Sequence, residues 1–123
     1  MPITATPTTA EIVAAAKRLG GLRAWHSQLV RKVKKLCQFA STSPNSTTLN
    51  NLYALDTQIQ KNDDNIEEMF VFCIAFAVDV VESKSFNDLF EAYTGESSHM
   101  RETLLLTISR LETFLKPLSL IHI

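Results

Sequence analysis

The chain has 123 residues, a length that fits one domain. Hydrophobic residues make up 46% and charged residues 20%, which excludes wholesale disorder; three Gly and four Pro are too few for a collagen-like or turn-rich β architecture. The formal net charge is -1, so no global field indicates a nucleic-acid or membrane partner.

The first predicted helix covers about residues 9–41. Its apolar residues recur at alternating steps of three and four, which is the spacing of a buried helical stripe. The members of this stripe are Ile12, Ala15, Leu19, Leu22, His26, Leu29, Val33, Leu36 and Ala40. Thr8 and Glu11 form a Thr-x-x-Glu capping box just before it. Residues 1–8 are therefore expected to be a disordered arm.

The second predicted helix covers about residues 47–83. It follows the segment Ser41–Ser46, whose Pro44 and short polar side chains favour a turn. A second stripe with the same spacing runs through Leu52, Leu55, Ile59, Asn62, Ile66, Met69, Cys73, Phe76 and Val80. From Met69 onward the other faces are also apolar, so this part of the helix should be buried on more than one side.

The third predicted helix covers about residues 86–116, after a soft break at Ser83-Lys84-Ser85. Its stripe is Phe86, Phe90, Tyr93, Ser97, Met100, Leu104, Thr107, Leu111, Phe114 and Leu118. Gly95 can divide it into a shorter and a longer piece, and Pro117 should end it. We expect an all-α fold, an antiparallel up-down-up bundle that forms one domain over residues 9–117. Residues 118–123 are expected to be a frayed or artefactual tail.

An antiparallel hairpin about Pro44 places residues at the same level when their numbers sum to about 88. His26 then faces Asn62, and each is the polar member of an otherwise apolar stripe, so we predict a buried register pair. The same rule places Cys37 and Cys73 roughly 33 Å apart along the bundle, so both thiols should be free.

Charge is divided unevenly along the chain. Residues 1–41 hold seven basic side chains and one acid, whereas the remainder holds five basic and twelve acidic residues. The candidate nucleic-acid-binding residues are Arg23, Arg31, Lys32, Lys34 and Lys35. Clustered cations of this kind can neutralise phosphates. The alternative interpretation is a solvated helical face that lies opposite the acidic second and third helices.

Aromatic residues concentrate near the second turn. The candidate apolar interaction patch comprises Phe70, Phe72, Phe76, Phe86, Phe90 and Tyr93. A thin three-helix bundle would leave part of this set uncovered, available for self-association or for the rest of a larger polyprotein. A small-molecule or lipid carrier with its cavity among Phe70, Phe76 and Tyr93 is a further alternative.

Sequence motifs indicate no catalytic, metal or cofactor site. No His lies at chelating spacing from a Cys or another His, and Asn62–Glu68 lacks the ligand pattern of a calcium loop. The chain is therefore expected to be non-enzymatic, with no cofactor and no small-molecule substrate. The longest apolar run, Met69–Val81, is too short to span a membrane, and no secretory signal precedes the cysteines, so a cytoplasmic location is expected.

The sequence resembles a helical domain of BEL/Pao-type retrotransposon polyproteins, a Gag-like region upstream of the aspartic protease. The resemblance is carried by Leu22-Arg23-x5-Leu29-x6-Leu36-x2-Phe39, by the Leu52–Glu68 helix, by Phe86-x3-Phe90-Glu91-x-Tyr93 and by Leu104–Leu115. It implies a structural or assembly segment with no catalytic residues to carry over. We therefore expect a non-enzymatic helical interaction and assembly module, or alternatively a helical domain that binds RNA or DNA through the basic face of its first helix.

Overall fold

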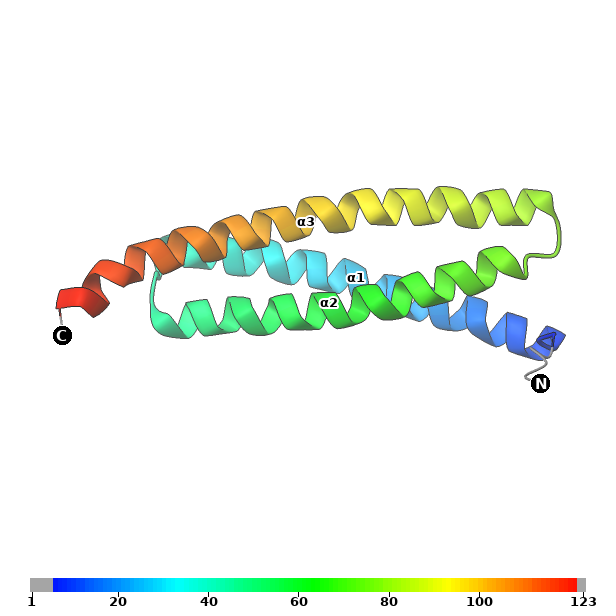
Figure 1. Cartoon of the computed structure of the whole chain (residues 1–123), viewed down its shortest axis with the longest axis horizontal. Helices are drawn as coiled ribbons and strands as arrows, with labels where there is room; N and C mark the ends of the chain where they lie inside the picture. The colour runs from blue at the N-terminus through cyan, green and yellow to red at the C-terminus, as the bar shows by residue number, and fades with distance from the viewer. Residues whose placement is uncertain (1–5, 122–123) are drawn as a thin grey trace.

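Three long helices make up the fold, as the sequence predicts. The computed structural model describes residues 6–121, and side chains for residues 6–116. The helices are α1 (Thr9–Thr42), α2 (Ser46–Ala75) and α3 (Val80–Ile121). They run up, down and up along one elongated bundle, and no strand occurs over the described range (Figure 1). Residues 1–5 of the expected arm and 122–123 of the expected tail lie outside what the structure describes; Thr6–Thr8 are non-helical, and residues 118–121 are helical rather than frayed.

The first two helices start where their caps place them. Thr8 Oγ1 accepts a hydrogen bond from the Glu11 backbone N–H at 3.1 Å, and the Thr8 N–H donates to the Glu11 carboxylate at 3.3 Å, which completes the capping box. Asn45 Oδ1 accepts from the Thr48 N–H at 2.9 Å and so caps α2. The predicted turn around Pro44 is confirmed by these contacts.

The second turn is displaced from its predicted position. It occupies residues 76–79, so α2 ends at Ala75 rather than 83 and α3 begins at Val80 rather than 86. Asp79 supplies the cap, since its Oδ1 accepts from the Glu82 N–H at 2.8 Å. The segment Ser83–Ser85 is helical, because Ser and Lys weaken a helix without ending it.

The other end of α3 and its middle also differ from expectation. The helix is continuous through Gly95, whose backbone has no positive φ, and it continues across Pro117 to Ile121 rather than ending at 116. A proline inside a helix bends it without always ending it. The path of α3 bends at its C-terminal end in Figure 1.

The buried core has two apolar clusters with a polar layer between them. The larger cluster includes Leu29, Leu52 and Leu104, and the smaller one is Leu19, Ile66, Phe70 and Cys73. The polar layer comprises His26, Asn62 and Ser97, each at most 6% exposed. Along each helix this layer falls between the residues of the two clusters, so it interrupts the apolar stripe near the middle of the bundle.

The stripes predict most of the buried residues, including Leu104 and Leu111 of α3, and fail in that helix at Thr107 and Phe114. There Ile108 is buried in place of Thr107, and Phe114 is exposed while Leu115 packs against the core. Val80, a predicted stripe member of the second helix, is exposed because it begins α3. The free state predicted for Cys37 and Cys73 is confirmed.

Candidate functional site

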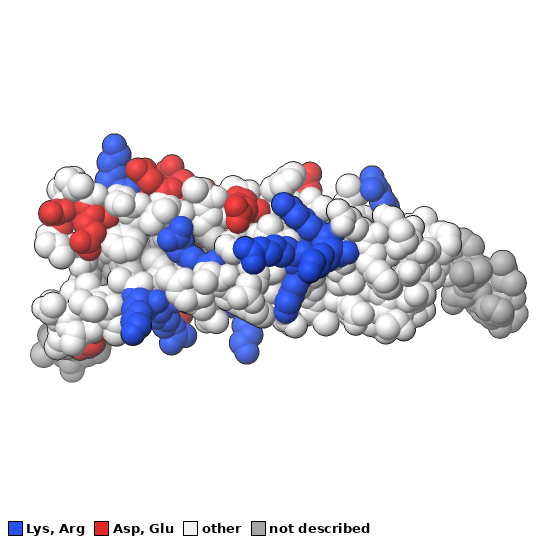
Figure 2. Space-filling model, turned by 180° about the vertical axis from the view of Figure 1, so that it is seen from behind, with Lys and Arg blue, Asp and Glu red and all other residues white. Residues whose placement is uncertain are grey.

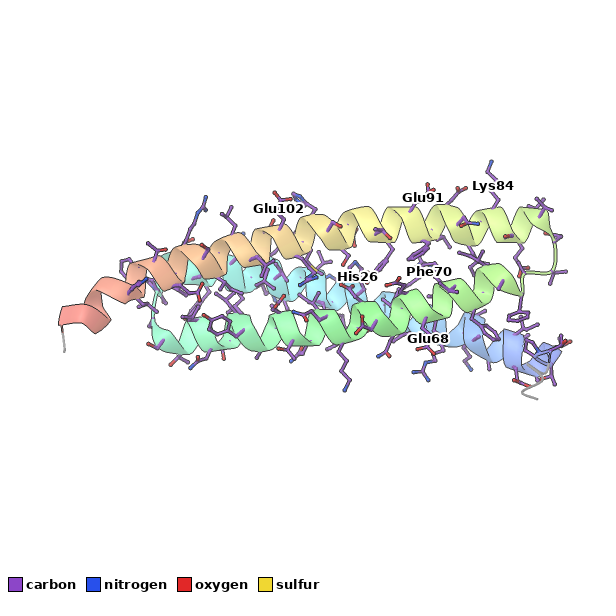
Figure 3. All side chains as sticks on the ribbon, in the orientation of Figure 1. His26, Glu68, Phe70, Lys84, Glu91 and Glu102 are labelled. Atoms are coloured by element: carbon purple, nitrogen blue, oxygen red, sulfur yellow. The ribbon has the colours of Figure 1, made fainter. Side chains whose placement is uncertain are left out.

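The polar layer is organised around two carboxylates from different helices. His26 Nε2 and Glu96 Oε1 are joined by a hydrogen bond of 2.8 Å, and the His26 ring packs edge-on against Tyr93 with centroids 4.7 Å apart. Both partners belong to α3, and His26 is labelled near the middle of the bundle in Figure 3. The structure therefore connects α1 to α3 at this level.

The predicted register pair needs correction. His26 and Asn62 are both buried, but no hydrogen bond joins their side chains among the described residues, and Asn62 Nδ2 makes no hydrogen bond there. The numbering rule gives the level at which two residues lie and not the direction in which their side chains point. His26 of α1 lies beside both α2 and α3, and its imidazole forms a hydrogen bond with the Glu96 carboxylate of α3 rather than with Asn62 of α2.

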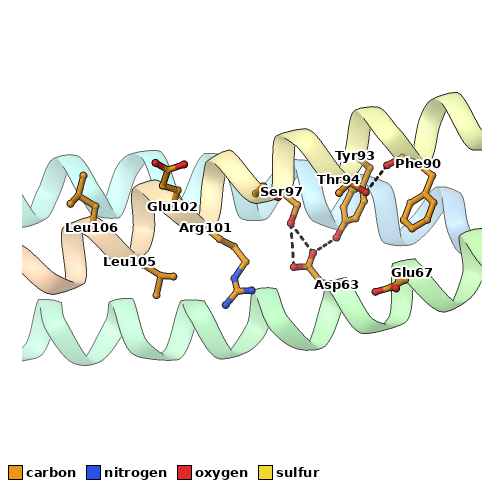
Figure 4. A pocket seen from close by; sticks show the side chains of 11 residues that line it. Asp63, Glu67, Phe90, Tyr93, Thr94, Ser97, Arg101, Glu102, Leu105 and Leu106 are labelled. Carbon is orange, nitrogen blue, oxygen red and sulfur yellow. Dashed lines mark hydrogen bonds between the residues drawn. The ribbon is translucent and has the colours of Figure 1, made fainter.

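The second carboxylate, Asp63, joins α2 to α3. Its oxygens accept hydrogen bonds from the Tyr93 hydroxyl and from Ser97 Oγ, the latter at 3.0 and 3.2 Å (Figure 4). Burial raises the pKa of Tyr93, and the hydrogen bond to Asp63 raises this pKa further. Because these hydrogen bonds join α2 to α3 at one level, the network can fix the register of the two helices.

An open groove of about 790 Å³ adjoins this network between α2 and α3. Asp63, Tyr93 and Ser97 line it together with the exposed Leu105 and Leu106 (Figure 4). Phe70, which the carrier hypothesis places in a cavity, does not line this groove. It is fully buried and stacks on Phe90 with ring centroids 4.9 Å apart.

The raised pKa of Tyr93 predicts a loss of stability at alkaline pH. The folded pKa lies above the unfolded value of about 10, so this contribution to stability is complete below pH 10 and is lost as the pH rises further. The loss is at most about 1.4 kcal/mol per pH unit. Thermal unfolding between pH 8 and 11.5 should show that Tyr93→Phe flattens this decline. Tyr53→Phe, at an exposed tyrosine, is the control and should flatten it less.

The predicted nucleic-acid-binding residues are exposed but do not share one face. Lys32 and Lys35 line a groove between α1 and α2, whereas Arg23 and Lys34 line grooves between α1 and α3. Arg31 is exposed and lines none of these grooves. Figure 2 shows basic side chains gathered on the face to which α1 contributes, with acidic side chains mainly along another edge.

Within residues 6–116, no Lys or Arg of α1 forms an ion pair with the acidic helices. The ion pairs within residues 6–116 are His26–Glu96 and Arg101–Asp56, the latter at 3.6 Å, and neither involves a Lys or Arg of α1. Sequence reasoning also missed Trp25, which is 36% exposed and lies under the Lys32 ammonium at 4.7 Å. The signal that could have found it is its separation of seven residues from Lys32.

The predicted apolar patch is mostly core. Phe70 is buried, and Phe86, Phe90 and Tyr93 are half-buried against the smaller cluster. Phe72 and Phe76 pack on each other at the end of α2, with Phe76 more exposed. Four valines around the second turn are more exposed than any residue of the predicted patch. These are Val71, Val78, Val80 and Val81, at 57 to 84%.

Comparisons with protein-family models, with curated proteins and with solved structures found no match. Within the described part of the chain, no three His, Cys, Asp or Glu side chains are grouped as a metal site would require. No described helix has a stretch both apolar and long enough to cross a bilayer.

Proposed function

We propose that this chain is a non-enzymatic helical interaction module that associates with a second copy of itself through its apolar end. The observation that carries this proposal is the set of exposed valines at the α2–α3 turn, defined here as Val71, Val78, Val80 and Val81. Several strongly exposed apolar side chains near one end of a bundle are typical of an interaction surface.

A second copy is the partner that the charges at this end favour. Asp79 and Glu82 lie beside the valines, and the exposed Lys84 follows one turn later (Figure 3). A two-fold contact brings the same patch onto itself, so a surface carrying both signs can pair the cation of one copy with an acid of the other. The chain's net charge of -1 adds little repulsion between copies.

The resemblance to BEL/Pao-type polyproteins supports the same class of function. It implies a Gag-like structural segment, and such a segment acts by assembling rather than by catalysis. In a longer polyprotein the apolar end would bring neighbouring copies together.

Sedimentation equilibrium tests the proposal, with the expected dimer having a Kd on the order of 0.1 mM. Burying a valine side chain fully contributes roughly 1.5 to 3 kcal/mol. The eight valines that two copies bring together are each buried only in part, so their sum exceeds the cost of association only by a modest margin. Val81→Asp should weaken the dimer at least tenfold, because it places a charge in the apolar contact. Because the contact is mainly apolar, the Kd should rise only a few-fold between 50 and 500 mM salt, through screening of the Lys84 charge pairs.

Leu106→Asp is the matched control, since Leu106 is also an exposed apolar residue of α3 but lies outside the turn. It should leave the dimer unchanged. A chain that stays monomeric at 1 mM, or a dimer that both variants weaken equally, would contradict self-association through this end.

A further inference from the structure

One flank of α1 alternates cations and aromatic rings at intervals of seven residues. Arg18, Trp25, Lys32 and Phe39 occupy this flank, and all four are exposed. Seven residues are close to two helical turns, so consecutive members lie about 10.5 Å apart along the axis and on the same side of the helix. Trp25 and Phe39 are therefore about 21 Å apart with Lys32 midway between them.

Both rings on this flank are exposed to solvent, and the Lys32 ammonium covers part of one face of Trp25. Phe39 is 51% exposed and Trp25 is 36% exposed, so neither serves mainly to fill the core. The Lys32 ammonium lies 4.7 Å from the Trp25 ring centroid, which is cation–π geometry. This contact holds a positive charge beside an aromatic surface.

A groove of about 540 Å³ runs beside this flank, between α1 and α2. Lys32, Lys35 and Phe39 line it from α1, and the amides of Asn51 and Gln58 line it from α2. None of the described residues that line it is acidic.

Two of the five carboxylates of α2 are engaged with α3, and the other three, Asp64, Glu67 and Glu68, do not line the groove. Asp56 pairs with Arg101 and Asp63 accepts from Tyr93 and Ser97, all of which belong to α3. The groove therefore combines cations that form no ion pair, amide hydrogen-bonding groups and an exposed ring. The basic side chains over α1 are visible as a cluster in Figure 2.

We propose that this groove and the adjoining flank of α1 bind single-stranded nucleic acid. Bases stack on Trp25 and Phe39, while Arg18, Lys32 and Lys35 contact the phosphates between and beside them. Stacking requires unpaired bases, so a single strand suits the site and a duplex does not. An acidic peptide would satisfy the cations but would leave both rings without a planar partner. The site is separate from the apolar end, so the inference does not depend on self-association.

The chain contains one tryptophan, which makes Trp25 a reporter within the proposed site. Titration with a 12-nucleotide oligouridylate should quench its fluorescence, and anisotropy of a labelled strand should give the same Kd. Three phosphate contacts predict a log-log salt slope of about −2 for a single strand. Polyglutamate of equal charge should bind more weakly and without quenching, and a duplex of the same length should not compete.

Matched variants separate stacking from charge. Phe39→Ala should weaken binding at least about fivefold, whereas Phe114→Ala, at a ring 54% exposed on α3, should not. The double variant K32E/K35E should weaken binding about tenfold more than R23E/K34E, which makes the same change of charge on the α3 side.

Three outcomes would overturn the inference. Equal losses from the two double variants would mean diffuse electrostatic attraction. Equal binding of polyglutamate without quenching would identify an acidic protein partner instead. Unchanged Trp25 fluorescence at saturation by the oligouridylate would exclude stacking at this flank.

Discussion

Phe70→Ala should lower the free energy of unfolding by about 3 to 5 kcal/mol. Phe70, labelled in Figure 3, is the largest fully buried side chain, and its ring packs against those of Phe90 and Tyr93 of α3. Its removal leaves a cavity in the smaller apolar cluster, which has few other members to close it. Domains of this size are stable by roughly 5 to 15 kcal/mol, so the loss is a large share of the total.

Urea unfolding followed by circular dichroism measures this loss of free energy. Thermal unfolding should show a fall of roughly 10 to 20 °C in Tm. Phe114→Ala is the control, because it removes the same side chain from an exposed position of α3 and should cost less than about 1 kcal/mol. Equal losses in the two variants would mean that the smaller cluster does not stabilise the bundle.

The first turn was predictable from sequence and the second was not, for a physical reason. Pro44 and Asn45 have side chains that end one helix and cap the next, so the turn is encoded in local chemistry. The second turn lies inside the apolar run Met69–Val81, where Asp79 is the single polar residue. Periodicity cannot locate a break when every face is apolar.

The site was predictable in part. Burial of His26 and Asn62 follows from their places in the stripes, but the partner of His26 depends on how the third helix packs, which pairwise register does not specify. The basic residues of α1 were evident from sequence, although their division between two grooves was not. Trp25 is identified as a neighbour of these basic residues only when its seven-residue helical spacing from Lys32 is considered along with the charges.

The two proposed surfaces lie on different parts of the bundle, so one chain could use both at once. The valines surround the α2–α3 turn at one end, whereas the groove beside Lys32 and Phe39 lies along α1 and α2. Self-association through the end would leave the groove open on each copy. An assembly of this kind would present several nucleic-acid sites together, and avidity would then compensate for weak binding by each site.

Adjacent residues of α2 should give opposite results when each is changed to leucine. Asn62→Leu should raise the free energy of unfolding by about 1 to 2 kcal/mol, since it removes a buried amide N–H₂ that makes no hydrogen bond among the described residues. Asp63→Leu should lower it by about 2 to 3 kcal/mol, because the Tyr93 and Ser97 hydroxyls would then lose their shared acceptor.

Both effects are measured by urea unfolding at pH 7, where the linear extrapolation resolves differences of this size. Asp63→Asn is the control, because its amide oxygen still accepts a hydrogen bond, and it should cost less than Asp63→Leu. A loss of stability in Asn62→Leu would mean that the Asn62 amide has a partner the fold depends on. With these results, Asp63 would stabilise the bundle and its neighbour Asn62 would destabilise it, so the polar layer would specify the register of the helices rather than add to the free energy of unfolding. Register is specified because a shift of either helix would bury the Asp63 carboxylate without its hydroxyl donors.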